Sequence, residues 1–187
     1  TIINTTIEDV EASHYGGAIY WNAADGELLD STIKNNDAIY GGGIYFDPNA
    51  ADCRILRTTF DGNTAQANGG AIDCNAVNME IINITFKNNR AQFGAALCRE
   101  INATGGHGYN NSFIANHATK GGAALGWVNA KRIYIEKYTF INNTAGVDGG
   151  AIYVGQGSDN CTIFNCYFEG NHLTDDDSGH GGAIYTV

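Results

Sequence analysis

Apolar residues recur along the chain at a nearly constant spacing. Each repeat has a Phe or Ile, followed three positions later by Asn in all repeats but the first, and then by a Gly that precedes Gly or Ala. The apolar position falls at Ile7, Ile33, Phe60, Phe86, Phe113, Phe140 and Phe168, so the successive spacings are 26, 27, 26, 27, 27 and 28. A fixed period of about 20 to 50 residues indicates a solenoid, a propeller or another repeat array.

The repeat at residues 131–158 predicts three short strands. Ile133 and Ile135 alternate with polar or amphipathic residues, and further strands are expected at 138–140 and 151–154. The segment 142–146 has turn chemistry, and the Gly pair marks a sharp corner. A propeller blade needs about 40 residues or more. We therefore predict an all-β fold, a single-stranded parallel β-helix of about seven rungs that forms one domain over residues 1–187.

Two further columns are expected to be structural. In a parallel β-helix, equivalent side chains of successive rungs stack, so one apolar column faces the interior and the amides of an Asn column bond from rung to rung. The apolar column is Ile19, Ile44, Ile72, Leu97, Leu125, Ile152 and Ile184. The Asn column is Asn36, Asn63, Asn89, Asn116, Asn143 and Asn171, with Val10 in its place in the first repeat.

Charge and cysteine content narrow the function classes. The formal net charge is -10 and no Lys/Arg cluster occurs, which argues against nucleic acid or an anionic membrane face as a partner. No run of about 20 apolar residues is present, so we expect no membrane insertion by this segment, and the absence of a signal peptide suggests a mature or excised segment. The five cysteines fall in positions that do not pair between adjacent rungs, and we expect buried free thiols.

The paired motifs resemble those of known surface proteins. The motif Gly-Gly-Ala-Ile occurs at 16–19, 69–72, 149–152 and 181–184, and Phe-x-x-Asn begins at Phe60, Phe86, Phe113, Phe140 and Phe168. These repeats resemble the paired motifs of chlamydial polymorphic outer membrane proteins and, more closely, the repeat regions of adhesin-like surface proteins of methanogenic archaea. The resemblance implies a right-handed parallel β-helix on an archaeal cell exterior, used for adhesion or as a surface layer. No barrel, wall anchor or membrane tether is recognisable here.

The seventh repeat carries the best candidate chemistry. Its interval from Phe168 to Gly181 is longer than the matching interval in the other repeats, and the insertion contains His172, Asp175, Asp176, Asp177 and His180. The insertion is superficially similar to the Asp-Asp and Gly-His-Gly elements of polygalacturonases. In that family these elements lie on separate rungs, whereas here Asp177 and His180 lie three residues apart on one loop. We therefore expect no catalytic residues. Carboxylates could bind Ca²⁺ and imidazoles a transition metal, but no known calcium-loop spacing is present. A solvated acidic loop is the preferred interpretation, with no cofactor other than possible Ca²⁺ at Asp175–Asp177. The segment 106–108 (Gly-His-Gly) is expected as a wide turn.

Aromatic residues follow the apolar column. Tyr20, Tyr45, Tyr153 and Tyr185 form two pairs that flank a gap at Asp73, Cys98 and Gly126, and Trp21 and Trp127 stand one position further on. A stabilising ladder is the preferred interpretation. If these rings are exposed, they could bind a glycan or another protein.

Six sequons suggest a glycosylated exterior. They begin at Asn4, Asn83, Asn102, Asn110, Asn142 and Asn160, about twice the number that chance predicts. We expect a non-enzymatic extracellular surface protein, adhesin-like or structural, that contacts a cell-surface glycan or protein. One alternative is a filament or sheath subunit that stacks head to tail on copies of itself. The other is a polysaccharide-active enzyme, which predicts paired acidic residues on adjacent rungs facing one groove.

Overall fold

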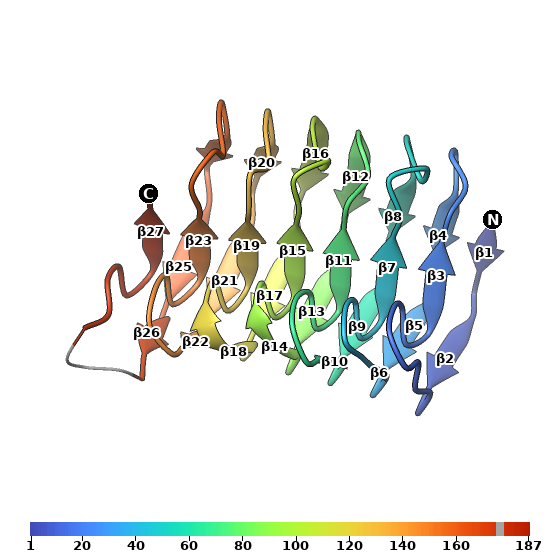
Figure 1. The fold of residues 1–187 in the computed structure, drawn as a ribbon, viewed down its shortest axis with the longest axis horizontal. Helices are drawn as coiled ribbons and strands as arrows, with labels where there is room; N and C mark the ends of the chain where they lie inside the picture. Colours follow the sequence, from blue (N-terminus) through green and yellow to red (C-terminus); the bar gives the residue numbers. More distant parts are fainter. Residues whose placement is uncertain (175–177) are drawn as a thin grey trace.

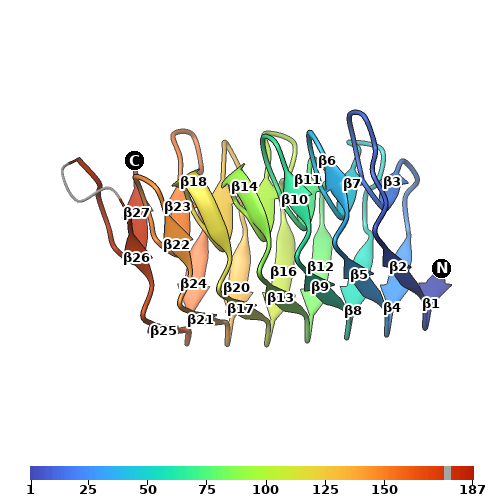
Figure 2. The same cartoon turned by 90° about the horizontal axis from the view of Figure 1, so that it is seen from below.

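Each strand pairs in parallel with the equivalent strand of the next rung, one repeat further along the chain. The structure is a computed structural model that describes residues 1–174 and 178–187. Figures 1 and 2 show the rungs side by side along the long axis, with the two termini at opposite ends. The predicted all-β parallel β-helix is therefore confirmed, and the seven-stranded sheets span six turns between the first and the seventh equivalent strand.

The chain passes through four sheets in every rung except the first, which has no strand in the third sheet. The first sheet contains β1 (Ile2–Ile3), β4 (Glu27–Leu29), β8 (Arg54–Leu56), β12 (Met79–Ile82), β16 (Gly106–Tyr109), β20 (Tyr134–Glu136) and β24 (Thr162–Phe164). The second sheet contains β2 (Thr6–Glu8), β5 (Thr32–Lys34), β9 (Thr59–Asp61), β13 (Thr85–Lys87), β17 (Ser112–Ile114), β21 (Thr139–Ile141) and β25 (Tyr167–Glu169).

The remaining two sheets complete each rung. The third contains β6 (Asp37–Ala38), β10 (Thr64–Ala65), β14 (Arg90–Phe93), β18 (His117–Gly121), β22 (Thr144–Ala145) and β26 (His172–Leu173). The fourth contains β3 (Ile19–Trp21), β7 (Ile44–Phe46), β11 (Ile72–Cys74), β15 (Leu97–Arg99), β19 (Leu125–Trp127), β23 (Ile152–Val154) and β27 (Ile184–Thr186).

The third sheet corrects the expectation of three strands per rung. Residues 142–146 were expected as a turn, but Thr144 and Ala145 form β22, which pairs with β18 and β26. The strand is only two residues long, and its Ala side chain is buried against the alanines of neighbouring rungs. A strand of this length has no visible alternation, so the sequence pattern shows only the adjoining turn.

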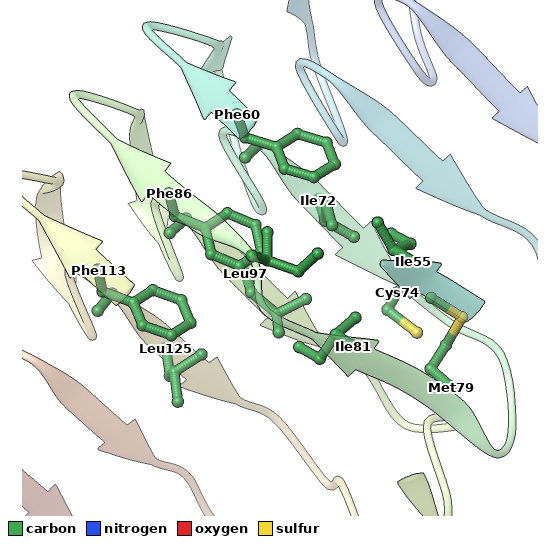
Figure 3. Close-up of a cluster of buried hydrophobic side chains, with 14 of the residues drawn as sticks. Ile55, Phe60, Ile72, Cys74, Met79, Ile81, Phe86, Leu97, Phe113 and Leu125 are labelled. Atoms are coloured by element: carbon green, nitrogen blue, oxygen red, sulfur yellow. The ribbon is translucent and has the colours of Figure 1, made fainter. Parts of the chain in front are cut away.

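Two apolar columns fill the interior, as predicted. The Phe rings stack from rung to rung at centroid distances of 5.1, 4.7, 5.1 and 4.6 Å between Phe60 and Phe168. Figure 3 shows three of these rings in one row beside a second row of Ile72, Leu97 and Leu125. Both columns belong to one continuous core apart from Ile184, which is exposed at the end of the solenoid. The other end-rung members, Ile7, Ile19 and Phe168, are partly buried.

The Asn column forms a buried ladder. Asn89 Nδ2 donates to Asn116 Oδ1 (2.9 Å) and to the Phe60 carbonyl (3.2 Å). Its own Oδ1 accepts from the backbone N–H (3.0 Å) and the amide (3.1 Å) of Asn63. The same contacts recur along the column, and the Val10 N–H at its start bonds to Asn36 Oδ1. The prediction of stacked amides is confirmed.

The segment 106–108, expected as a wide turn, is part of strand β16. Its glycines lie opposite Met79 and Ile81 of β12. A Cβ at Gly108 would collide with the Tyr138 hydroxyl, and one at Gly106 would lie 2.8 Å from Arg99 Nη1. The missing side chains therefore make room for two large side chains that are fully buried inside the solenoid.

All five cysteines are free thiols. Cys53, Cys74 and Cys98 are buried, as expected, whereas Cys161 and Cys166 lie in the seventh rung and are half-buried. The seventh rung has no further rung packed on it among the described residues, so its inward side chains are less covered.

Candidate functional site

A row of side chains runs along the outer face of the fourth sheet. Successive residues of a strand point to opposite faces, so the residue after each buried Ile or Leu points outward. The row is Tyr20, Tyr45, Asp73, Cys98, Gly126, Tyr153 and Tyr185. Tyr20 stacks on Tyr45 at 5.7 Å and Tyr153 lies 5.7 Å from Tyr185. The four predicted tyrosines thus lie in two pairs beside a gap.

A second row lies next to it, at the residue before each Gly corner. It consists of Tyr15, Tyr40, Asn68, Phe93, Gly121, Asp148 and His180. Tyr15 lies 5.5 Å from Tyr40 and 4.6 Å from Tyr45, so the first tyrosine pair belongs to a larger aromatic cluster. Sequence reasoning missed this row, although its members share one position in the repeat.

The gap between the tyrosine pairs contains a cavity of about 400 Å³, called here the gap cavity. Its lining residues are Asn68, Phe93, Val128, Asn129, Tyr153, Gly155 and Gln156. The Phe93 and Tyr153 rings lie 5.6 Å apart, and Lys120 Nζ is 5.5 Å from the centre of the Phe93 ring. Aromatic faces and side-chain amides therefore meet in one concave site.

Glycines keep this region open. A Cβ at Gly126 would lie 2.9 Å from the Gly94 nitrogen, and one at Gly121 would lie 3.1 Å from Tyr153 Cδ2. Because the Gly94 backbone approaches so closely, a tyrosine does not fit at position 126 without a backbone shift. The interruption of the tyrosine row is thus built into the backbone.

Beside the gap cavity lies a cluster formed by Asp73, Cys98 and Glu100, called here the acid–thiol cluster. One carboxylate oxygen from each acid and the Cys98 sulfur lie within 4.8 Å of one another. Asp73 is 1% exposed, and neither of its oxygens has a hydrogen-bond partner. Burial, reinforced by the nearby Glu100, raises the pKa of the Asp73 carboxyl well above its ordinary value.

The other two members of the cluster have contacts. Glu100 Oε1 accepts a 2.6 Å hydrogen bond from Asn68 Nδ2, and Cys98 Sγ lies 3.9 Å from the same oxygen. Burial and the charge of Asp73 raise the pKa of the Cys98 thiol well above its ordinary value. Asn68 also lines the gap cavity, so one amide connects the two features. The sequence showed Asp73 and Cys98 only as a break in the tyrosine row, and it gave no sign of Glu100.

The first tyrosine pair is held by a strong hydrogen bond. Tyr20 Oη donates to Asp47 Oδ2 at 2.6 Å, and this bond raises the pKa of Tyr20 to about 12. The phenol therefore stays protonated, while 47% of the residue is exposed. One face of the ring is available to a partner in solution.

The two predicted tryptophans do not share this surface. Trp127 is 1% exposed, and Trp21 is half-buried and stacks on Phe46 at 5.6 Å. Both follow an outward residue by one position, so strand alternation turns them inward. Trp127 is therefore buried and cannot contact a ligand at the surface. The expectation that it contributes to a binding surface is wrong. Trp21 packs against the core cluster.

Two of the five predicted metal ligands of the seventh repeat are described by the structure. His180 Nδ1 lies 3.0 Å from Asp148 Oδ1, and its ring stacks on Tyr185 at 5.4 Å. His172 Nδ1 lies 3.2 Å from the Gly170 carbonyl. Asp175, Asp176 and Asp177 lie outside the described residues, so a metal site at this loop stays a prediction.

All six predicted glycosylation sites lie at the surface. Asn4, Asn83, Asn102, Asn110, Asn142 and Asn160 are exposed. All except Asn102 have a positive φ between 50° and 57° and stand at corners of the rungs. Asn tolerates this left-handed conformation, which gives these asparagines a structural role whether or not they are modified. Glycosylation itself stays a prediction.

Comparison with known proteins gives one family. A family model described as a right handed beta helix region matches residues 17–186. No curated protein and no solved structure shows significant similarity to the chain. Among the described residues, no helix has the length and apolar character needed to cross a membrane.

Proposed function

Because the chain belongs to the right-handed beta-helix family, we propose that it is a non-enzymatic binding module of an extracellular surface protein. The fourth sheet would present its tyrosine pairs and the gap cavity to a glycan chain that runs along the solenoid axis. The likeness of the repeats to those of adhesin-like surface proteins supports this role. Membership in the family does not by itself support this role, because the same fold occurs in proteins of different function.

The observation that carries the proposal is the composition of the gap cavity. Phe93 and Tyr153 offer apolar ring faces, and Asn68, Asn129 and Gln156 offer amide donors and acceptors. Ligand sites combine an apolar or aromatic lining with a few polar groups that fix orientation. A sugar ring has the matching chemistry, with C–H groups on its faces and hydroxyls at its edge.

Charge narrows the class of glycan. The chain carries a formal net charge of -10, and Asp47, Glu100 and Asp148 lie along the same face. Like charges brought together oppose binding. Neutral or amine-bearing oligosaccharides are therefore favoured over uronic-acid or sulfated chains.

The test is retention of the chain on immobilised neutral oligosaccharides, measured by surface plasmon resonance. Tyr153→Ala removes one ring of the gap cavity and Tyr185→Ala removes the ring that lies 5.7 Å from it. Each change should weaken retention by at least about tenfold, because ring contacts carry much of the binding energy at such sites.

A matched control is Tyr134→Ala, which removes an outward, half-buried ring from the first sheet instead of the fourth. This variant should bind as the natural chain does, and circular dichroism should show that all three variants stay folded. Unchanged retention after both Tyr153→Ala and Tyr185→Ala would contradict the proposed surface. Absence of retention on every glycan would leave a protein as the ligand and reject the glycan assignment.

The second candidate function is a polysaccharide-active enzyme. Asp73 and Glu100 favour it, because they are acidic residues on adjacent rungs of one outer face. Catalysis by two carboxyl groups requires both to reach the scissile bond of the sugar. Both Asp73 oxygens are buried, so binding is the better supported function. An enzymatic function would be supported by turnover on a panel of polysaccharides that is lost in Glu100→Gln or on replacement of Asp176 or Asp177.

A further inference from the structure

The least expected group in the molecule is the carboxyl of Asp73. Its side chain is buried and both oxygens lack a hydrogen-bond partner. A buried carboxyl without a partner is costly, and buried charges in proteins are normally paired or coordinate a metal. Among the ion pairs that the described residues form, none involves Asp73 or Glu100. Within residues 1–174 and 178–187, no side chain forms an ion pair that compensates the Asp73 carboxylate.

The atoms around Asp73 form a set of metal ligands. The Cys98 sulfur and one oxygen each from Asp73 and Glu100 lie within 4.8 Å of one another. In a tetrahedral zinc site the metal–oxygen bonds are about 2.0–2.2 Å and the metal–sulfur bond about 2.3 Å, so ligand atoms stand about 3.5 Å apart. Ion binding would therefore draw the three atoms closer together through rotation of their side chains.

The thiol decides which ions fit. Calcium and magnesium take oxygen ligands, whereas a thiolate selects zinc and related transition ions. A bound divalent cation would remove the thiol proton and neutralise the carboxylates, which reverses the effect of burial on their pKa values. The high pKa that Cys98 has without an ion is thus no obstacle, although it makes binding pH-dependent.

The cluster also has a supporting contact and a route to solvent. Asn68 donates to Glu100 at 2.6 Å and so fixes the orientation of that carboxylate. Such partners of ligand groups are typical of metal sites. Asn68 lines the gap cavity, and Glu100 is only half-buried, so an ion can reach the cluster from that side.

We propose that Asp73, Cys98 and Glu100 form a binding site for one divalent transition-metal ion, best matched to Zn²⁺, with a fourth position that faces the gap cavity. Asp73 lies in β11, Cys98 lies in β15 and Glu100 directly follows β15. The ion would thus cross-link two adjacent rungs on the outer face. This inference goes beyond glycan binding and does not depend on it.

Cobalt titration tests the site. The intact chain, reduced and freed of metal with a chelator, is titrated with Co²⁺ and then with Zn²⁺. We expect one Co²⁺ per chain with a thiolate-to-cobalt charge-transfer band in the near ultraviolet, and displacement of the band by one equivalent of Zn²⁺. Zn²⁺ should also raise the thermal unfolding midpoint, because an ion that binds only the folded state stabilises it.

Two variants locate the ligands. Cys98→Ala should abolish the charge-transfer band, and Asp73→Asn, which keeps the shape of the side chain, should weaken Zn²⁺ binding by at least about tenfold. Two controls should bind as the natural chain does. Cys74→Ala removes the buried thiol that points into the core on the neighbouring rung, and serines at Asp175, Asp176 and Asp177 remove the other predicted metal site.

Three results would contradict the proposed metal site. A natural chain without the band at stoichiometric Co²⁺ would overturn it and leave Asp73 as a neutral buried acid. A band that persists in Cys98→Ala would overturn it as well, because another thiol would then be the ligand. Should Cys98→Ala fail to fold, unchanged zinc affinity in Asp73→Asn would reject the site.

Discussion

At the scale of the residue, one position of the repeat changes character from rung to rung. The outward position after the apolar column holds Tyr45 in the second rung, Asp73 in the third and Cys98 in the fourth. The backbone is the same in each case, because the strands are in register. The change of side chain alone therefore converts a stacked aromatic position into a buried polar cluster.

The free chain should show the cost of Asp73 as a pH dependence. Between the ordinary carboxyl pKa of about 3.9 and the raised pKa in the folded chain, the folded state holds one proton more than the unfolded state. The free energy of unfolding therefore falls as pH rises, by up to about 1.4 kcal/mol per pH unit. The side chain of Asp73→Asn does not titrate. The free energy of unfolding of this variant should therefore rise relative to that of the natural chain as the pH rises.

Urea denaturation with a chelator present at pH 4.5, 5.5 and 6.5 measures this difference. Glu100, Cys98 and Tyr45 lie close to Asp73, and all three are kept in both proteins. A constant difference between Asp73→Asn and the natural chain across the three pH values would show that the Asp73 pKa is not raised.

At the scale of the element, the stacked columns provide most of the specificity of the fold. Each inner Asn side chain of the buried ladder bonds backbone and side-chain groups of both neighbouring rungs. Since buried polar groups are costly when unpaired, this ladder fixes the register between rungs. The Phe stack beside it is non-directional and would tolerate a small slip.

Asn89→Ala should therefore be strongly destabilising. It removes the acceptor of the Asn63 backbone N–H, one bond each of the Asn63 and Asn116 side-chain amides, and the side-chain bond to the Phe60 carbonyl. We expect a loss of at least about 2 kcal/mol in the free energy of unfolding, measured by urea denaturation.

The neighbouring Asn88 provides the control. It is exposed, has a φ of 58°, and its side chain bonds to Asp61 on the surface. Asn88→Gly suits that backbone conformation and should change stability by about 0.5 kcal/mol or less. Equal effects of the two substitutions would contradict the assignment of register to the buried ladder.

At the scale of the whole molecule, the strands of each rung pair only with strands of the adjacent rungs. The first and last strands of each sheet pair on one side only, and apolar side chains of the end rungs, such as Ile3 and Ile184, are exposed. Open strand edges are templates for pairing with another chain. Head-to-tail association of the isolated chain stays a prediction, and these open strand edges are the observation that motivates it.

Ile184→Lys places a charge at the open end and should suppress this association. Sedimentation velocity over a range of protein concentrations should show concentration-dependent assemblies for the natural chain and monomers for the variant. Ile101→Lys is the control, because Ile101 is exposed and lies just after β15, the middle strand of the seven in its sheet. Monomers at every concentration for the natural chain would reject self-stacking.

The sequence alone was sufficient for the architecture. The period of the Phe, Asn, Gly and Ile positions predicted the parallel β-helix, its interior columns and the Asn ladder, because a stack of equal rungs demands the same residue type at each level. It failed for the two-residue strands of the third sheet and for the glycines of β16. In both cases the decisive contacts come from neighbouring rungs, a full repeat away along the chain.

The candidate site depended on tertiary structure. Repetition made the tyrosine pairs and the gap visible, but the burial of Asp73, the approach of Glu100 and the lining of the gap cavity follow from the packing of adjacent rungs. The inward direction of Trp127 was implicit in strand alternation, yet only the observed strand bounds fixed it. A repeat determines what its members share, whereas the environment of a residue that departs from the repeat is set by its neighbours in space.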